Sequence, residues 1–73
     1  MASDSTTTLV ADIGETAGRI WELLDREGPL ALARIARATG KPRDMSMLAV
    51  GWLAREGKVD ITVERRSRIV VLR

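Results

Sequence analysis

Three glycines divide this sequence into segments of different hydrophobic periodicity, and this division restricts the possible folds most strongly. Gly28 and Gly40 each follow a stretch in which apolar residues recur at helical spacing, and Gly57 follows a third. Beyond Gly57 the apolar residues alternate with polar ones. Because glycine readily adopts the left-handed conformation that ends helices, each glycine is expected to stop one. The sequence therefore predicts three helices followed by strands, which is an α+β fold.

The first helix is expected to run from Leu9 to Gly28, after a disordered tail over residues 1–8, which are mostly small and polar. Its apolar residues recur at steps of three and four and form one stripe: Val10, Ile13, Ala17, Ile20, Trp21 and Leu24. Gly14 and Gly18 lie beside this stripe, although each costs about 1 kcal/mol relative to alanine within a helix. We interpret them as a smooth groove for another helix or a large ring; simple tolerance of glycine is the alternative.

The next two helices form a helix-turn-helix pattern. A short helix is predicted over residues 32–39, with Arg34 and Arg37 facing outward. The residues expected to face inward from it are Leu32, Ile35 and Ala36. Gly40 stops this helix, and Pro42 suits the first turn of a third helix over residues 42–56. Helix, glycine turn and helix in this order are typical of DNA-binding domains.

The C-terminal part reads as a β-hairpin. Val59, Ile61 and Val63 alternate with polar residues, and residues 69–72 form a second apolar run. The polar turn over residues 64–68 carries three arginines. The predicted architecture of residues 9–73 is therefore a winged helix-turn-helix domain, with a three-helix core and a C-terminal β-hairpin wing. Truncation of Ile20, Leu53 or Ile61 to alanine is expected to cost about 2–5 kcal/mol if these side chains are buried.

The third helix is apolar on two sides. On a helical wheel the side expected to face the core carries Met47, Val50, Leu53 and Ala54. The opposite side carries Met45, Leu48, Ala49 and Trp52. Helices that are apolar nearly all round are usually buried on more than one side. Either the first helix covers the second side, with Trp52 against Gly14 or Gly18, or a second copy of the domain or another protein partner buries Met45, Leu48 and Trp52. A DNA-facing surface is the third interpretation.

The charges are distributed unevenly along the chain. Residues 1–28 hold six acidic and two basic residues, residues 29–42 hold three basic and no acidic residues, and residues 43–73 hold seven basic and four acidic residues. This gradient indicates an anionic partner for the basic part, with ordinary solvated surface as the alternative. The residues expected to contact double-stranded DNA are Arg34, Arg37, Lys41 and Arg43 around the helix-turn-helix, and Arg65, Arg66 and Arg68 on the wing.

Several functional classes are disfavoured by composition. With no cysteine and no histidine, the chain has no disulfide and none of the usual zinc ligand sets. It has no secretory signal and no apolar run near the roughly 20 residues of a membrane helix, so a cytoplasmic location is expected. No nucleophile with an evident base and no phosphate-binding loop is present, so we expect no enzyme activity, no cofactor and no small-molecule ligand.

Two stretches resemble a small winged helix-turn-helix family of bacterial proteins of unknown function. They are residues 13–21, IGETAGRIW, and residues 51–56, GWLARE. The resemblance extends over Leu9 to Leu72 and implies a three-helix core, a wing of two or three strands and, by analogy, DNA binding or transcription regulation. It implies no catalytic residue and no cofactor. The chain departs from the family where small polar residues usually precede the second and third helices, since Ala31 and Pro42 stand there.

Overall fold

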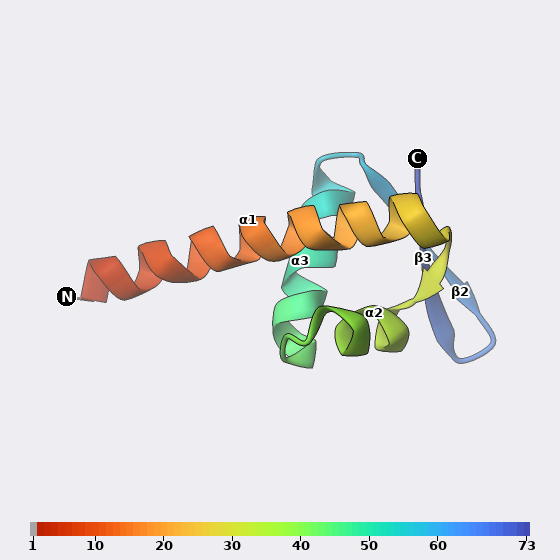
Figure 1. Cartoon of the computed structure of the whole chain (residues 1–73), viewed down its shortest axis with the longest axis horizontal. Helices are drawn as coiled ribbons and strands as arrows, with labels where there is room; N and C mark the ends of the chain where they lie inside the picture. The colour runs from red at the N-terminus through yellow and green to blue at the C-terminus, as the bar shows by residue number, and fades with distance from the viewer. Residues whose placement is uncertain (1) are drawn as a thin grey trace.

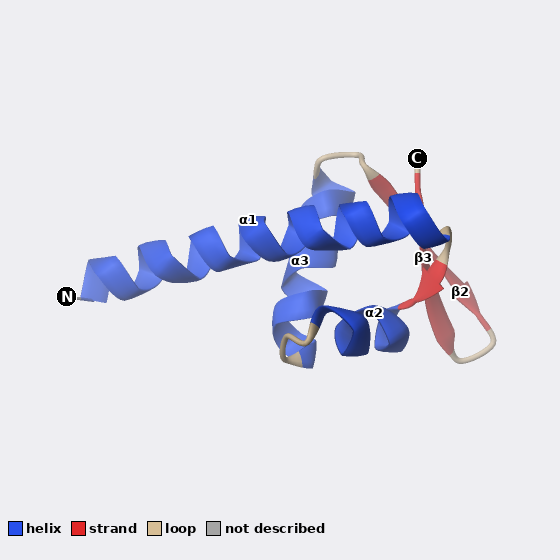
Figure 2. Ribbon diagram, viewed as in Figure 1, coloured by secondary structure: helices blue, strands red, loops and turns tan. Residues whose placement is uncertain are grey.

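The protein consists of three helices and a small antiparallel sheet. The computed structural model describes the backbone of residues 2–73 and the side chains of residues 9–73. The elements in chain order are α1 (Ala2–Glu27), β1 (Leu30–Ala31), α2 (Leu32–Thr39), α3 (Arg43–Arg55), β2 (Val59–Glu64) and β3 (Ser67–Leu72) (Figures 1 and 2). This arrangement confirms the predicted winged helix-turn-helix. The bounds of α2 coincide with the prediction, although neither Ala31 nor Pro42 caps its helix with a side-chain hydrogen bond.

The sheet has the strand order β1-β3-β2, with both neighbours antiparallel to β3. Glu64 pairs with Ser67, so the hairpin closes through a loop of two residues. Leu30 pairs with Val70 and Ala31 with Ile69, which attaches the hairpin to the start of α2. Strand β1 was missing from the residue-level prediction, because two residues are too few to show a period of two.

The core lies where α1 crosses α3 and where α2 and the sheet close the remaining sides (Figure 1). Ile20 on α1, Ile35 on α2 and Val70 on β3 are fully buried. Burial of Ile20 and Leu53 agrees with the prediction. The glycine at the end of α3 completes a hydrogen-bonded helix stop, since the Gly57 N–H donates to the Ala54 carbonyl at 3.0 Å and the Lys58 N–H to the Leu53 carbonyl at 2.9 Å.

Helix α1 is much longer than the body that it covers. Its 26 residues correspond to about 39 Å, and the molecule measures 42 × 21 × 19 Å. The N-terminal part of α1 therefore projects beyond the other elements (Figure 1). The sequence predicted a tail over residues 1–8 and a helix from Leu9. Met1 lies outside the described residues, and the helix already begins at Ala2.

The side of α3 that faces the core differs from the prediction. Its buried residues are Ser46, Ala49, Val50 and Leu53. Met47, predicted to be core, is 48% exposed, and Ala49, predicted to face away, is 0% exposed. The buried stripe has regular helical spacing but begins on a serine, whose hydroxyl oxygen lies 3.3 Å from Thr39 Oγ1. Val50 and Leu53 are core residues as predicted, but the polar residue at the first core position shifted the predicted stripe toward Met47.

The hairpin extends beyond the helices, and this corrects a second expectation. Val59 at the start of β2 is 2% exposed, whereas Ile61 is 42% and Val63 is 71% exposed. The prediction that Ile61 is a core residue was wrong, because the alternating face of β2 meets the helices only at its first residue.

Candidate nucleic-acid interface

The turn between α2 and α3 is held by the side chain of Thr39. Its hydroxyl donates to the Ala36 carbonyl at 3.2 Å and therefore accepts from the Ser46 hydroxyl at 3.3 Å, since its own proton is already engaged. The Lys41 backbone N–H donates to the same oxygen at 3.4 Å. Gly40 makes the sharp turn possible with a φ of 70°, which favours glycine. These contacts fix where Lys41 and, just beyond it, Arg43 leave the backbone.

The wing carries its arginines on and beside a strained loop. Arg65 and Arg66 form the two-residue loop of the hairpin, and Arg65 has a φ of 58°. Arg68 follows on β3, directly before Ile69, which pairs with Ala31 at the start of α2. The register of β1 and β3 therefore brings Arg68 close to the beginning of α2.

Two adjoining hollows lie between α2, α3 and the wing. The smaller one, of about 90 Å³, is lined by Ala31, Leu32, Ala33, Arg43, Arg66, Ser67 and Arg68. The larger one, of about 500 Å³, is lined by Ala33, Ala36, Arg37, Gly40, Lys41 and Arg43. The hollows share Ala33 and Arg43, and no acidic residue among residues 9–73 lines either of them. We call this continuous surface the basic face.

The basic face contains five of the seven residues expected to contact DNA: Arg37, Lys41, Arg43, Arg66 and Arg68. The other two, Arg34 and Arg65, are exposed on α2 and on the loop but line neither hollow. Among residues 9–73, none of the seven takes part in an ion pair. Their charges are therefore available to a ligand.

The outer side of α3 offers few groups that could read a base. Met47 and Leu48 are 48% and 50% exposed, and Gly51 is also exposed. Hydrogen bonds to base edges come mainly from arginine, lysine, asparagine and glutamine. Only Arg43 and Arg55, at the two ends of α3, belong to that group.

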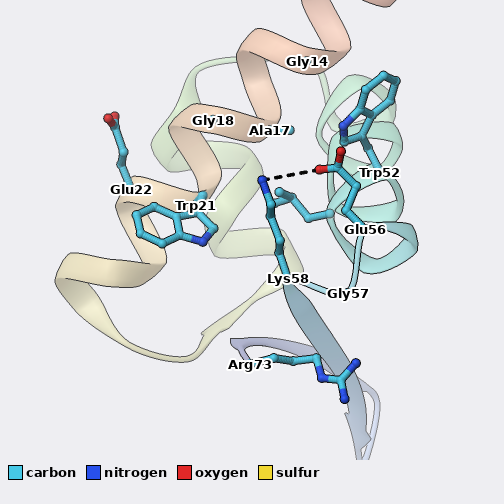
Figure 3. A pocket seen from close by; sticks show the side chains of 11 residues that line it. Gly14, Ala17, Gly18, Trp21, Glu22, Trp52, Glu56, Gly57, Lys58 and Arg73 are labelled. Carbon is cyan, nitrogen blue, oxygen red and sulfur yellow. Dashed lines mark ion pairs between the residues drawn. The ribbon is translucent and has the colours of Figure 1, made fainter.

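A separate groove of about 660 Å³ shares no lining residue with the basic face. It lies between α1 and α3 (Figure 3). Trp21 on α1 and Trp52 on α3 stand on its two sides, with Gly14 and Gly18 between them along α1. The tryptophans are 39% and 40% exposed. We call it the tryptophan groove. The sequence predicted a smooth surface at Gly14 and Gly18 but assigned Trp21 to the core stripe, so it did not indicate that Trp21 lines the groove.

The interpretation in which α1 covers Trp52 describes its position only in part. Helix α1 does pack on α3, but a Cβ atom placed on Gly14 or Gly18 would meet no atom within 4 Å. The Trp52 ring therefore does not lie on either glycine. Met45 is half-buried and Leu48 is half-exposed, so the outer side of α3 is only partly covered within the chain.

The C-terminal end of the tryptophan groove is charged. Lys58 Nζ lies 3.6 Å from Glu56 Oε1, and Arg73 Nε lies 3.5 Å from Asp60 Oδ2. All four side chains are between 43% and 61% exposed, so these pairs contribute little to stability. Arg73 reaches this end because its backbone N–H donates to the Lys58 carbonyl at 3.0 Å, a pairing that sequence spacing does not reveal.

Comparison with known proteins agrees with this fold. A family described as "Winged helix-turn-helix domain (DUF2582)" matches residues 5–73. The chain belongs to this DUF2582 family. An uncharacterized protein, MJ1608, of Methanocaldococcus jannaschii is 33% identical over 63 residues, which are 84% of this chain and 90% of that protein. The solution NMR structure of protein BT2368 from Bacteroides thetaiotaomicron has a TM-score of 0.78 and 31% identity, covering 85% of this chain and 76% of that one.

The DUF2582 description names a fold and leaves the activity open. No helix in the described part of the chain is long and apolar enough to cross a bilayer. Among residues 9–73, no three histidine, cysteine, aspartate or glutamate side chains are grouped to hold a metal ion. The expected cytoplasmic location, the expected lack of a cofactor or small-molecule ligand and the expected lack of enzyme activity stay predictions.

Proposed function

We propose that this DUF2582 protein binds double-stranded DNA through the basic face and acts as a transcriptional regulator with weak sequence specificity. The observation that carries the proposal is that Arg43, Arg66 and Arg68 all line the smaller hollow of the basic face. Arg37 and Lys41 line the adjoining larger hollow. These side chains come from three elements and meet in space without any lining carboxylate. Phosphate groups are the natural ligands of such a cluster, because neutralising them releases bound counterions.

The conformation of Arg65 supports a role for the wing. A non-glycine residue in the left-handed region costs about 1–2 kcal/mol, and glycine or asparagine would fit that position with less strain. The chain instead has arginine at both positions of the loop. Strained residues of this kind often lie at functional sites. An arginine in this strained position costs stability. Its positive charge at the tip of the wing supports contact between the wing and the DNA backbone.

The contacts would be mainly to the DNA backbone. Phosphate contacts position a protein on a duplex without reading its sequence. The exposed middle of α3 presents Met47, Leu48 and Gly51, which lack the side-chain groups for base readout. We therefore expect affinities that differ little between duplexes of unrelated sequence.

Fluorescence anisotropy with labelled duplex DNA tests the proposal. For about five phosphate contacts, a plot of log K against log salt concentration should have a slope near −4.5. Replacing Arg68 with glutamine should weaken binding to all sequences and make this slope shallower by about 1. The matched control is Arg73→Gln, which removes the same charge from the tryptophan groove. Absence of binding at low salt, or equal losses for the two variants, would refute a localised basic interface.

A second candidate function is self-association through the outer side of α3. It is favoured by the exposure of Leu48 and Trp52, at 50% and 40%, beside the half-buried Met45. A homodimer would bury this apolar surface, and small domains gain stability from such burial. Sedimentation velocity on the wild type and on Leu48→Asp tests it, because an exposed aspartate leaves the fold intact but opposes burial. A wild-type protein that stays monomeric up to submillimolar concentration would rule this function out.

A further inference from the structure

The tryptophan groove has an open apolar side that continues along α1 beyond the body of the molecule. Its buried floor is formed by Ala17 and Leu53, each 3% exposed. Val10, one turn before Gly14, is 47% exposed, and Leu9 is 48% exposed. Both belong to the projecting part of α1, where no other element of the chain covers them (Figure 1).

The residues along this side of α1 have the spacing of a helix-pairing seam. Val10, Gly14, Gly18 and Trp21 follow one another at steps of four, four and three residues. A repeat of this kind keeps one stripe facing a neighbouring helix over several turns. The residues in the middle of this stripe have small side chains, and the residues at its two ends have larger ones. A second helix can therefore approach closely at the centre of the stripe.

The two glycines have no role inside the chain that would explain them. Each weakens a helix interior by about 1 kcal/mol relative to alanine. The space above Gly14 and Gly18 is open to 4 Å, so no neighbouring group among residues 9–73 requires the missing Cβ. Open space above two adjacent turns, between exposed tryptophans, is consistent with a helix backbone that comes from outside the chain (Figure 3).

From these features we infer that the tryptophan groove is occupied by α1 of a second copy of this protein, running antiparallel to the first. This inference rests on the self-association described above and specifies its contact surface. In the antiparallel arrangement Gly14 lies opposite Gly18 of the second copy, and Val10 lies against Trp21 of the second copy. Large residues then oppose medium ones at the ends, and small residues oppose each other at the centre.

The dimensions favour the antiparallel arrangement. The roughly 12 residues of α1 from Ala2 to Ile13 span about 18 Å, and the body of the molecule is 21 × 19 Å across. The projecting part of each copy is therefore long enough to lie across the body of the other. A parallel pair would leave both projecting parts in contact only with each other and would oppose Trp21 to Trp21.

The area is sufficient for a weak dimer. Leu9, Val10, Trp21 and Trp52 expose 39–48% of their surfaces, which amounts to about 350 Å² of apolar area per copy, given the size of such side chains. Met45, one heptad before Trp52, extends the same side of α3. With the small residues of the seam, the buried area approaches the roughly 600 Å² per partner of the smaller specific interfaces. An affinity on the order of 10 µM is expected, near the weak end for interfaces of this kind.

Sedimentation velocity from about 5 to about 500 µM, a range that brackets this affinity, tests the inference on three proteins. The wild type should shift from monomer to dimer. Gly18→Leu should remain monomeric, because its side chain fills the space of the second helix. Ala38→Leu should dimerise like the wild type, because it places the same side chain at an exposed position of α2 outside the groove. Circular dichroism should show that both variants fold, since Gly18 and Ala38 are both exposed.

The outcomes separate this inference from the functions proposed above. A monomeric wild type overturns both the dimer and its contact surface and leaves DNA binding untouched. If Gly18→Leu dimerises like the wild type while Leu48→Asp does not, self-association stands and the α1 contact is refuted.

Tryptophan emission gives a second measurement, since Trp21 and Trp52 are the only tryptophans and both lie at the contact. Dilution of the wild type should shift the emission to the red, and Gly18→Leu should show no such shift. A wild-type spectrum that is independent of concentration across the dimer transition would also refute the α1 contact.

Discussion

Replacement of Thr16 by valine is expected to stabilise this protein, and the same replacement at Thr39 is expected to destabilise it. Thr16 lies on α1 and is 0% exposed, and its Oγ1 atom has no hydrogen-bond partner among the described residues. Thr39 is half-buried, and its hydroxyl oxygen makes contacts of 3.2, 3.3 and 3.4 Å to Ala36, Ser46 and Lys41. Valine has nearly the shape of threonine and a similar helix propensity, so the comparison isolates the hydroxyl group.

The magnitudes follow from the hydrogen bonding at each site. A buried polar group without a partner costs about 1–3 kcal/mol, so removing the Thr16 hydroxyl should raise the free energy of unfolding by about 1 kcal/mol or more. For a domain of this size that corresponds to a rise of about 4–8 °C in Tm per kcal/mol. Loss of the Thr39 hydroxyl should lower the free energy of unfolding by about 1–2 kcal/mol, because Ser46 is fully buried and would lose its partner.

Urea denaturation followed by circular dichroism at one low protein concentration provides the assay. The midpoint should rise for Thr16→Val and fall for Thr39→Val, with an unchanged slope in both cases. The double variant should show additive effects, since the two hydroxyls share no partner. A loss of stability for Thr16→Val would show that this hydroxyl is satisfied in solution and would refute the reasoning.

Three further predictions concern stability and the wing. Leu53→Ala should lower the free energy of unfolding by about 2–5 kcal/mol. Ile61→Ala should lower it much less, because the Ile61 side chain is 42% exposed. Urea denaturation compares the two variants, and equal losses of stability would contradict the burial described for these side chains. In thermal melts Gly40→Ala should destabilise the protein by about 1–2 kcal/mol, because Gly40 has a φ of 70°. Gly51→Ala should stabilise the protein by up to about 1 kcal/mol. A change in stability of the same sign for both variants would disprove the backbone argument. Arg65→Gly should raise Tm by relieving the strained φ, yet weaken DNA binding in anisotropy titrations; unchanged affinity would remove the wing tip from the proposed interface.

The sequence predicted the order of elements well because glycines marked the helix ends. Gly40 and Gly57 both adopt positive φ, and the helices end beside them. The face of α3 was less predictable, since hydrophobicity alone favoured Met47 over Ser46 as a core residue. Buried Ser46 has a hydrogen-bond partner in Thr39 on another helix. A contact between two polar residues across a turn has no periodic signature in the sequence.

The candidate sites show the same limit. Charge and chain position indicated the seven residues expected to contact DNA, but they did not show that Arg66 and Arg68 line one hollow with Arg43 while Arg34 lies elsewhere. That placement depends on the register of β1 with β3. The tryptophan groove depends on how far α1 extends past α3. That distance is set by tertiary packing, which residue spacing along one helix does not determine.

The short strand β1 has a mechanical consequence. No residue separates Ala31, the last of β1, from Leu32, the first of α2. No flexible linker therefore separates β1, which pairs with the hairpin, from α2. A movement of the hairpin relative to α2 would break the two strand pairs that Leu30 and Ala31 make with β3. The spacing between the cations of the wing and those of α2 is therefore preorganised. An anion that spans them would lose little of its binding energy to ordering the backbone on which they stand.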